Sequence, residues 1–266
     1  MRRVMLSVFL GPLVLASPEG PTPDAATPVA VRNVEGELHG FLVMRTLAGA
    51  RVAHGDLLQL VRNGQVESRM VFRFDDGSLF DERVSFTDDS VFIMRKYTLV
   101  QRGPAFPDDE EITLERASGR YHIVSRGRTD DHAETHEGTL DLPADVYNGM
   151  VITIAKNLVP AGRALVHIVA FTPAPRLVQL EIAPVGAGQV RLGGHTETTA
   201  HYVFKPRLGV FIRLFAILGG RSPSDANAWI VTDDVPAFVR IDGALSTPGT
   251  IWRVELATPT WPDSTP

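Results

Sequence analysis

The stretch NGQVESRMVFRFDDGS, Asn63–Ser78, contains the clearest fold signal in this chain. Asn63-Gly64 is a strong signal for a two-residue β-hairpin turn, and Asp75–Ser78 is a second turn signal. Between the two turns, one face of the predicted strand is apolar and is formed by Val66, Met70, Phe72 and Phe74. Charged residues take most of the other face, as expected for a strand with one buried and one solvated side.

Similar turn signals and alternating runs continue from Gly36 to Leu142 and resume after Gly162. Two segments instead have apolar residues at helical spacing, Leu142–Leu158 and Leu208–Leu218. Strand runs at short spacing, without a repeating strand–helix–strand pattern, favour an antiparallel sheet. The predicted fold class is therefore mostly β: an antiparallel meander forming a barrel, half-barrel or sandwich, with one or two short helices.

The composition excludes several classes of protein. The chain has 266 residues, of which 44% are hydrophobic, so it can bury a core and differs from a disordered chain. It contains no cysteine, which excludes structural disulfides, cysteine-ligated zinc, iron–sulfur clusters and thiol catalysis. The formal net charge is −5, and a nucleic-acid partner is therefore not expected.

The N-terminal sequence is typical of a secretion leader. Arg2 and Arg3 precede the apolar run Leu6–Leu15, which is too short to cross a bilayer, and Ala16 offers a cleavage site. We expect residues 1–16 to be a signal peptide, 17–30 a disordered Pro-rich spacer, 31–258 a single β-rich domain and 259–266 a flexible tail. The mature protein would be periplasmic or secreted and have no transmembrane segment, and N-terminal sequencing of the exported protein tests this expectation.

The alternation in the central strands places a carboxylate among aromatic side chains. Glu82 is in phase with Phe80 and Phe86, and Arg95 is in phase with Tyr97 on the next predicted strand. Two interpretations stay open: a buried salt bridge between Glu82 and Arg95, or polar groups that orient a ligand in an apolar cavity. A ligand site on this face would consist of Phe72, Phe74, Phe80, Glu82, Phe86, Arg95 and Tyr97.

Two histidine-containing stretches offer an alternative, metal-binding site. They are TDDHAETHE, Thr129–Glu137, and HTETTAH, His195–His201. If each forms a strand, imidazole and carboxylate groups share one face, and such groups on neighbouring strands bind divalent metals. The candidate metal ligands are His132, Glu134, His136, His195, Glu197 and His201. The simpler interpretation is two solvated strand faces, so no metal or other cofactor is expected.

Six segments together resemble a family of exported bacterial β-rich proteins of unknown function. They are DGSLFDE (76–82), QRGPAFP (101–107), LPADVYNGM (142–150), TPAPRLVQL (172–180), WIVTDDVPAFVRIDG (229–243) and IWRVEL (251–256). The resemblance implies a secreted, mostly β protein, and it implies no catalytic residue. A looser similarity, at the level of the fold, is to periplasmic proteins that cradle lipids in a half-barrel.

These observations favour a binding protein over an enzyme. The chain contains no G-x-S-x-G, Walker, H-E-x-x-H or EF-hand motif. The leading hypothesis is an exported soluble protein that binds a lipid or other hydrophobic small molecule in an apolar cavity. The alternatives are a metal-assisted hydrolase that uses the His/Glu strand faces, and a structural or interaction domain of the envelope without a ligand site. The sequence leaves the oligomeric state open.

Overall fold

The structure, a computed structural model, describes residues 27–128, 132–171, 174–192, 194–207, 224–233, 235–245 and 249–257. The predicted signal peptide, the short helix predicted at 208–218 and the tail at 259–266 lie outside these ranges. Within them the chain forms one helix, α1 (Val151–Leu158), and fourteen strands: β1 (Leu38–Thr46), β2 (Arg51–Arg62), β3 (Gln65–Phe74), β4 (Leu79–Asp88), β5 (Phe92–Arg102), β6 (Asp108–Glu115), β7 (Arg120–Gly127), β8 (Glu134–Thr139), β9 (Ala164–Ala170), β10 (Arg176–Leu192), β11 (His195–Arg207), β12 (Ala226–Val231), β13 (Ala237–Ala244) and β14 (Ile251–Leu256).

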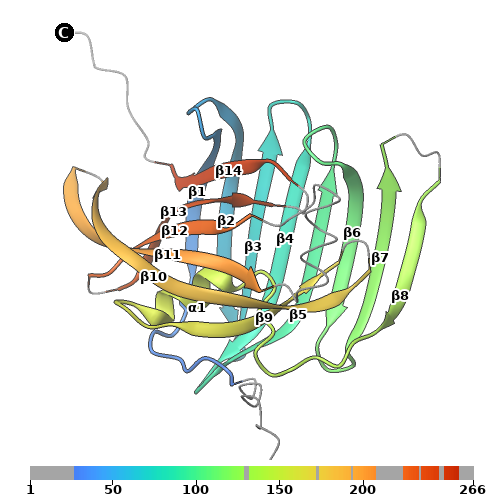
Figure 1. Ribbon diagram of the computed structural model, residues 1–266, viewed down its shortest axis with the longest axis horizontal. Helices are drawn as coiled ribbons and strands as arrows, with labels where there is room; N and C mark the ends of the chain where they lie inside the picture. The colour runs from blue at the N-terminus through green and yellow to red at the C-terminus, as the bar shows by residue number, and fades with distance from the viewer. Residues whose placement is uncertain are drawn as a thin grey trace, which may run out of the picture.

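All fourteen strands belong to one antiparallel sheet. Strands that are consecutive in sequence pair with each other, except β8 and β9, which form the two edges of the sheet. In addition, β1 pairs with β14. The sheet folds over itself, so that β9–β14 form a second layer that crosses β1–β7, with α1 between the layers (Figure 1). The predicted mostly β meander is confirmed, and its form is an open, curled sheet rather than a closed barrel.

The hairpin predicted at Asn63-Gly64 joins β2 to β3. Both turn residues have positive φ, 52° and 72°, and Arg62 pairs with Gln65 across the turn. A two-residue turn with positive φ at both positions matches the twist of the flanking strands, which is why Asn-Gly is favoured there. The turn therefore sets the register that places Phe72 and Phe74 on the buried face.

The helix is shorter than the sequence predicts. The apolar spacing predicts a helix over 142–158, but α1 begins at Val151. The preceding residues bond to β9 instead: Tyr147 donates its amide to the carbonyl of His167, and the His167 Nδ1 lies 2.9 Å from the carboxylate of Asp145. These bonds use backbone groups that a longer helix would need, so the segment forms turns around a single bridge between Val146 and His167 of β9.

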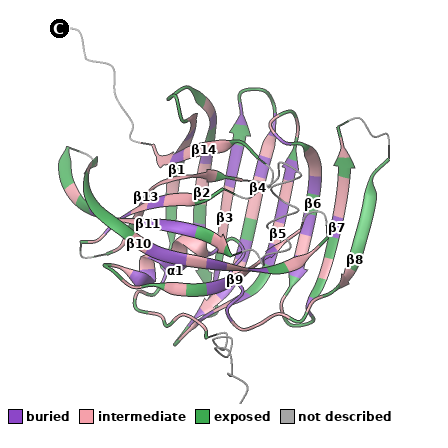
Figure 2. Cartoon of the chain, in the orientation of Figure 1, coloured by how far each residue is buried: buried purple, intermediate pink, exposed green. Residues whose placement is uncertain are grey.

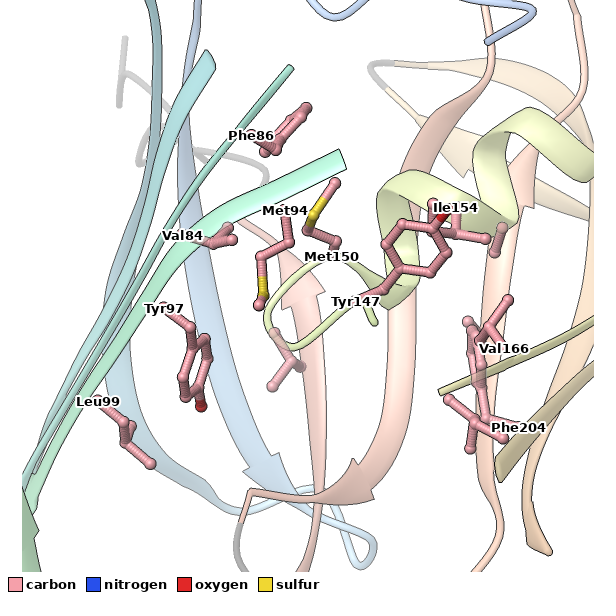
Figure 3. Close-up of a cluster of buried hydrophobic side chains, with 14 of the residues drawn as sticks. Val84, Phe86, Met94, Tyr97, Leu99, Tyr147, Met150, Ile154, Val166 and Phe204 are labelled. Carbon is pink, nitrogen blue, oxygen red and sulfur yellow. The ribbon is translucent and has the colours of Figure 1, made fainter. Parts of the chain in front are cut away.

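The core lies between the two layers and around α1. Buried and more exposed residues alternate along most strands (Figure 2), as expected for strands with one face toward the core. Residues from both layers and from the helix meet there, and Val84, Met94, Met150, Ile154 and Phe204 are among them (Figure 3). One continuous hydrophobic core of this kind is the property expected of a single domain.

The N-terminal segment joins this core earlier than predicted. The sequence predicts a spacer that runs to residue 30, yet the amide of Val29 donates to Tyr147 Oη at 2.9 Å and Ala30 forms a bridge with Val91. Glu35 is buried and ion-paired with Lys156 of α1 at 2.6 Å. These contacts attach the start of the described chain to Val91, to the segment before α1 and to α1 itself. Among the described residues, no helix has the length and apolar character needed to cross a membrane.

Candidate functional site

The interior face of β4 and β5 contains a hydrogen-bonded carboxylate. Tyr97 donates its hydroxyl to Glu82 Oε1 at 3.0 Å, and the register places Val84 opposite Tyr97 on the same face. Burial raises the pKa of Glu82, and the bond from Tyr97 offsets only part of that rise. Burial, together with the neighbouring Glu82 carboxylate, also raises the pKa of Tyr97 well above its ordinary value. Glu82 is thus a carboxyl group in an apolar setting.

Tyr97 is held in place from the second layer. Its ring stacks on Phe171, which follows β9, with ring centres 5.9 Å apart and planes 4° from parallel. Gly149 approaches the same ring with φ of 69°, and a Cβ there would lie 3.3 Å from Tyr97 and 3.2 Å from Val84. The loop before α1 can therefore cover this ring only with a glycine at its closest point. These contacts fix the direction of the Tyr97 hydroxyl toward Glu82.

The predicted pairing of Glu82 with Arg95 is wrong. A β-bulge in β5 pairs Met94 with Phe86 but Lys96 with Ser85, so Arg95 is the extra residue and the alternation changes phase there. Arg95 is exposed and lies 3.4 Å from the hydroxyl of Thr87. Tyr97, rather than a guanidinium, is the observed partner of Glu82.

A second interior carboxylate lies on β6 and is not among the predicted site residues. Glu110 is buried and pairs in register with Gln101, whose Nε2 donates to Glu110 Oε2 at 3.0 Å. Burial, and then the negative charge of Asp108, raise the pKa of Glu110. The other amide atom, Gln101 Oε1, is buried and has no hydrogen-bond partner. The alternation of Glu110 with Ile112 and Leu114 is the signal that could have revealed this inward face.

Part of the interior wall is reached by solvent. Leu57, Met70 and Glu82 lie side by side on β2, β3 and β4, and all three are half-buried. The inward residues that flank Glu82 along β4, Phe80 and Val84, are buried. We call Leu57, Met70 and Glu82 the interior strip. It combines two flexible apolar side chains with one carboxylate, inside the curled sheet.

The predicted phenylalanines are mostly part of the core. Phe72 and Phe86 are fully buried, and Phe80 retains only 2% of its surface, so these rings have almost no surface left for a ligand. Phe74 is the last residue of β3, and its ring contacts that of Trp252 with ring centres 5.9 Å apart. Of the seven predicted residues, six lie toward the interior and one, Arg95, lies outside.

Phe74 and Trp252 belong to a pocket at one end of the sheet, the mouth pocket. Its volume is about 360 Å³, and it is lined by Arg51, Val52, Phe74, Asp75, Asp76, Pro104, Ala105, Thr250 and Trp252. Beneath it, Phe106 is buried and contacts both Phe74 and Phe80, at centroid distances of 5.5 and 6.2 Å. The mouth pocket thus has an aromatic floor and a charged rim.

A larger hollow of about 450 Å³ lies on the outer side of β9–β11. Arg163, Leu165, Gln179, Glu181 and Arg207 are among its lining residues, and Arg207 is paired with Glu181. Leu165 is 41% exposed there and out of phase with the buried Val166, which places the hollow on the outer face. None of the predicted ligand residues lines it, and its charges are already paired in part, so the interior is the better candidate.

The two histidine stretches do not form one site. Glu134 and His136 lie on the edge strand β8, whereas His195, Glu197 and His201 lie on β11, which pairs with β10 and β12. His132 precedes β8 outside any strand. Within the described ranges, no group of three or more His, Asp or Glu side chains is close enough to bind an ion. His201 instead stacks on Trp229 at 4.4 Å.

We expect Glu82→Gln to stabilise the protein at neutral pH. A carboxyl group whose pKa is higher in the folded chain stabilises the fold at low pH and loses that contribution as the pH rises. Glutamine keeps an acceptor for the Tyr97 hydroxyl but has no charge to desolvate. Urea unfolding should therefore show a gain of about 1 kcal/mol at pH 7.5 that vanishes near pH 4. A loss of stability at pH 7.5 would instead indicate a cationic partner for Glu82.

Comparisons with known proteins assign no family. No family model and no curated protein matches the chain. The fold is similar to the crystal structure of a β-barrel-like protein of a domain of unknown function, DUF1849, from Brucella abortus. The two are 10% identical, the match covers 86% of this chain and 98% of that chain, and the TM-score is 0.43. We therefore derive a function from the residues of this chain alone.

Proposed function

We propose that the interior of the curled sheet binds a hydrophobic or amphipathic small molecule. The observation that carries the proposal is the interior strip: Leu57, Met70 and Glu82 face inward, yet solvent reaches all three. Small-molecule sites are concave, mostly apolar and supplied with a few polar groups that orient the ligand. In this site the apolar part of the ligand contacts Leu57 and Met70, and its polar group meets Glu82 and Tyr97.

The open edge of the sheet supports the same proposal. Strands β8 and β9 are the two edges of the sheet and do not pair with each other, so the curl is not closed into a barrel. The inward residues on either side of Glu82 along β4, Phe80 and Val84, are buried and packed. The site therefore needs little rearrangement to accept a ligand. Because the N-terminus has the features of a secretion leader, we also propose that binding takes place outside the cytoplasm.

A matched pair of variants tests the proposal. Leu57 and Leu58 are adjacent on β2 but point to opposite faces, with Leu57 inward and Leu58 36% exposed outward. Leu57→Trp fills the strip, so binding of the neutral fluorescent probe N-phenyl-1-naphthylamine should weaken by about tenfold or more, equivalent to about 1.4 kcal/mol. Leu58→Trp should leave the affinity unchanged. Circular dichroism and thermal melting confirm that each variant folds.

Three outcomes count against the proposal. Failure of the wild-type protein to bind the probe would favour an envelope domain without a ligand site. Equal affinities for the wild type and the folded Leu57→Trp variant would place binding elsewhere. Equal weakening by Leu58→Trp would show that the effect is not specific to the interior. If Leu57→Trp does not fold, Met70→Phe removes space from the same strip with a smaller change in volume.

A further inference from the structure

The interior wall of β4–β6 offers hydrogen-bond acceptors without matching donors. Glu82 receives one bond, from Tyr97, and Glu110 receives one, from Gln101. Both hydrogens of the Gln101 amide are used, because Nε2 donates to Glu110 and also to the carbonyl of Asp108 at 3.2 Å. Its acceptor atom, Oε1, remains without a partner although the residue is only 2% exposed. A buried polar atom of this kind is rare in folded proteins and calls for a partner.

The positive charges of these strands lie on the other face. Arg83 pairs with Asp81, Lys96 with Glu115 and Arg102 with Glu111, and all three basic side chains are more than half exposed. In the part of the chain that the structure describes, no basic side chain forms an ion pair with Glu82 or Glu110. The titratable group that faces Glu82 is Tyr97, and Glu110 lies near enough to act on Tyr97. The interior wall is therefore negative and rich in acceptors.

The three acceptors lie on one face of three neighbouring strands. Glu82 pairs in register with Leu99, and Gln101 follows two residues later on the same face of β5. Such diagonal neighbours are about 7–8 Å apart at the Cα positions. Gln101 in turn pairs directly with Glu110. A head that donates hydrogen bonds can therefore bind Glu82, and the next acceptors on the same face, Gln101 and Glu110, add to the negative potential beside it.

Building on the function proposed above, we propose that the ligand is a cationic amphiphile: an apolar chain that ends in a protonated amine. The ammonium group donates to Glu82 and supplies the charge that this wall lacks. The chain lies along Leu57 and Met70, whose side chains continue the strip away from the carboxylate. An ammonium has only donors and a carboxylate only acceptors, so the pair is complementary, and it is stronger away from bulk water. A fatty acid would instead bring two negative charges together.

Three ligands with alkyl chains of the same length separate the contribution of the head group to affinity from that of the alkyl chain. Dodecylamine, dodecanol and laurate are titrated below their micellar concentrations against bound N-phenyl-1-naphthylamine at pH 7.5. We expect dodecylamine to displace the probe at a concentration about tenfold or more below that of laurate, with dodecanol between them. Glu82→Gln should reduce the preference for the amine to within about threefold. Glu67→Gln removes the same charge from the exposed face of β3 and should leave the preference intact.

The outcomes separate this inference from the proposed function. If the probe binds and all three ligands displace it equally, or laurate does so best, the cationic head is wrong while the hydrophobic site stands. If the amine preference survives in Glu82→Gln, the assignment of the head to Glu82 is overturned. If the wild-type protein binds neither the probe nor dodecylamine, in direct calorimetry as well, both proposals fail. If Glu67→Gln also loses the preference for the amine, that preference comes from the overall negative charge of the protein, and the inference is overturned.

Discussion

Lys156→Met is expected to lower the free energy of unfolding by about 3–5 kcal/mol, because it leaves a buried carboxylate without its charge partner. Lys156 Nζ lies 2.6 and 2.7 Å from the two carboxylate oxygens of Glu35, and their side chains are 14% and 5% exposed. Gln59 donates a further bond to Glu35 at 3.0 Å but carries no charge. Chemical denaturation at neutral pH measures the change.

Two controls identify the cause of that loss. The double variant Glu35→Met with Lys156→Met removes both charges and should recover most of the stability, since apolar residues of similar volume often replace a buried pair at little cost. Lys96→Met breaks the pair with Glu115, in which both side chains are 51% exposed, and should cost less than about 1 kcal/mol. Equal losses for Lys156→Met and Lys96→Met would show that the ion pair between Lys156 and Glu35 is not buried.

Phe106→Ala is expected to cost about 3–5 kcal/mol, the usual cost of removing a buried aromatic side chain. Phe106 is 2% exposed and contacts Phe74 and Phe80 under the mouth pocket. Removing its ring leaves a cavity between Phe74 and Phe80. Phe41→Ala, at a position that is 61% exposed, should change stability by no more than about 0.5 kcal/mol. A neutral Phe106→Ala variant would show that the 103–106 loop does not cover the core.

The hairpin at Asn63-Gly64 and the strand faces around it could be predicted because the information is local. Turn chemistry and the alternation of side chains act over a few residues, and both are visible in the sequence. The same local logic placed Glu82 correctly on the inner face beside Phe80. It failed at Arg95, because one extra residue in β5 reverses the phase and has no clear signal in the sequence.

The helix boundary and Glu110 illustrate two further limits. The 142–150 segment has helical spacing, but Tyr147 and Asp145 bond to β9, and this contact depends on residues about twenty positions away. The acidic run at 108–111 resembles a solvated loop by composition, although β6 turns Glu110 inward beside Gln101. The pairing of β1 with β14 joins the first and last strands of the described chain and has no local signal at all.

Photolabelling reveals whether the interior strip of the curled sheet is where an apolar ligand binds. A neutral long-chain alcohol with a diazirine in its chain is equilibrated with the folded protein, irradiated, and its attachment sites are mapped by tandem mass spectrometry. We expect adducts at Leu57, Met70 or Glu82, and their loss when unlabelled dodecanol competes. Adducts confined to outward residues such as Leu58, or labelling that competition does not reduce, would contradict binding in the interior strip.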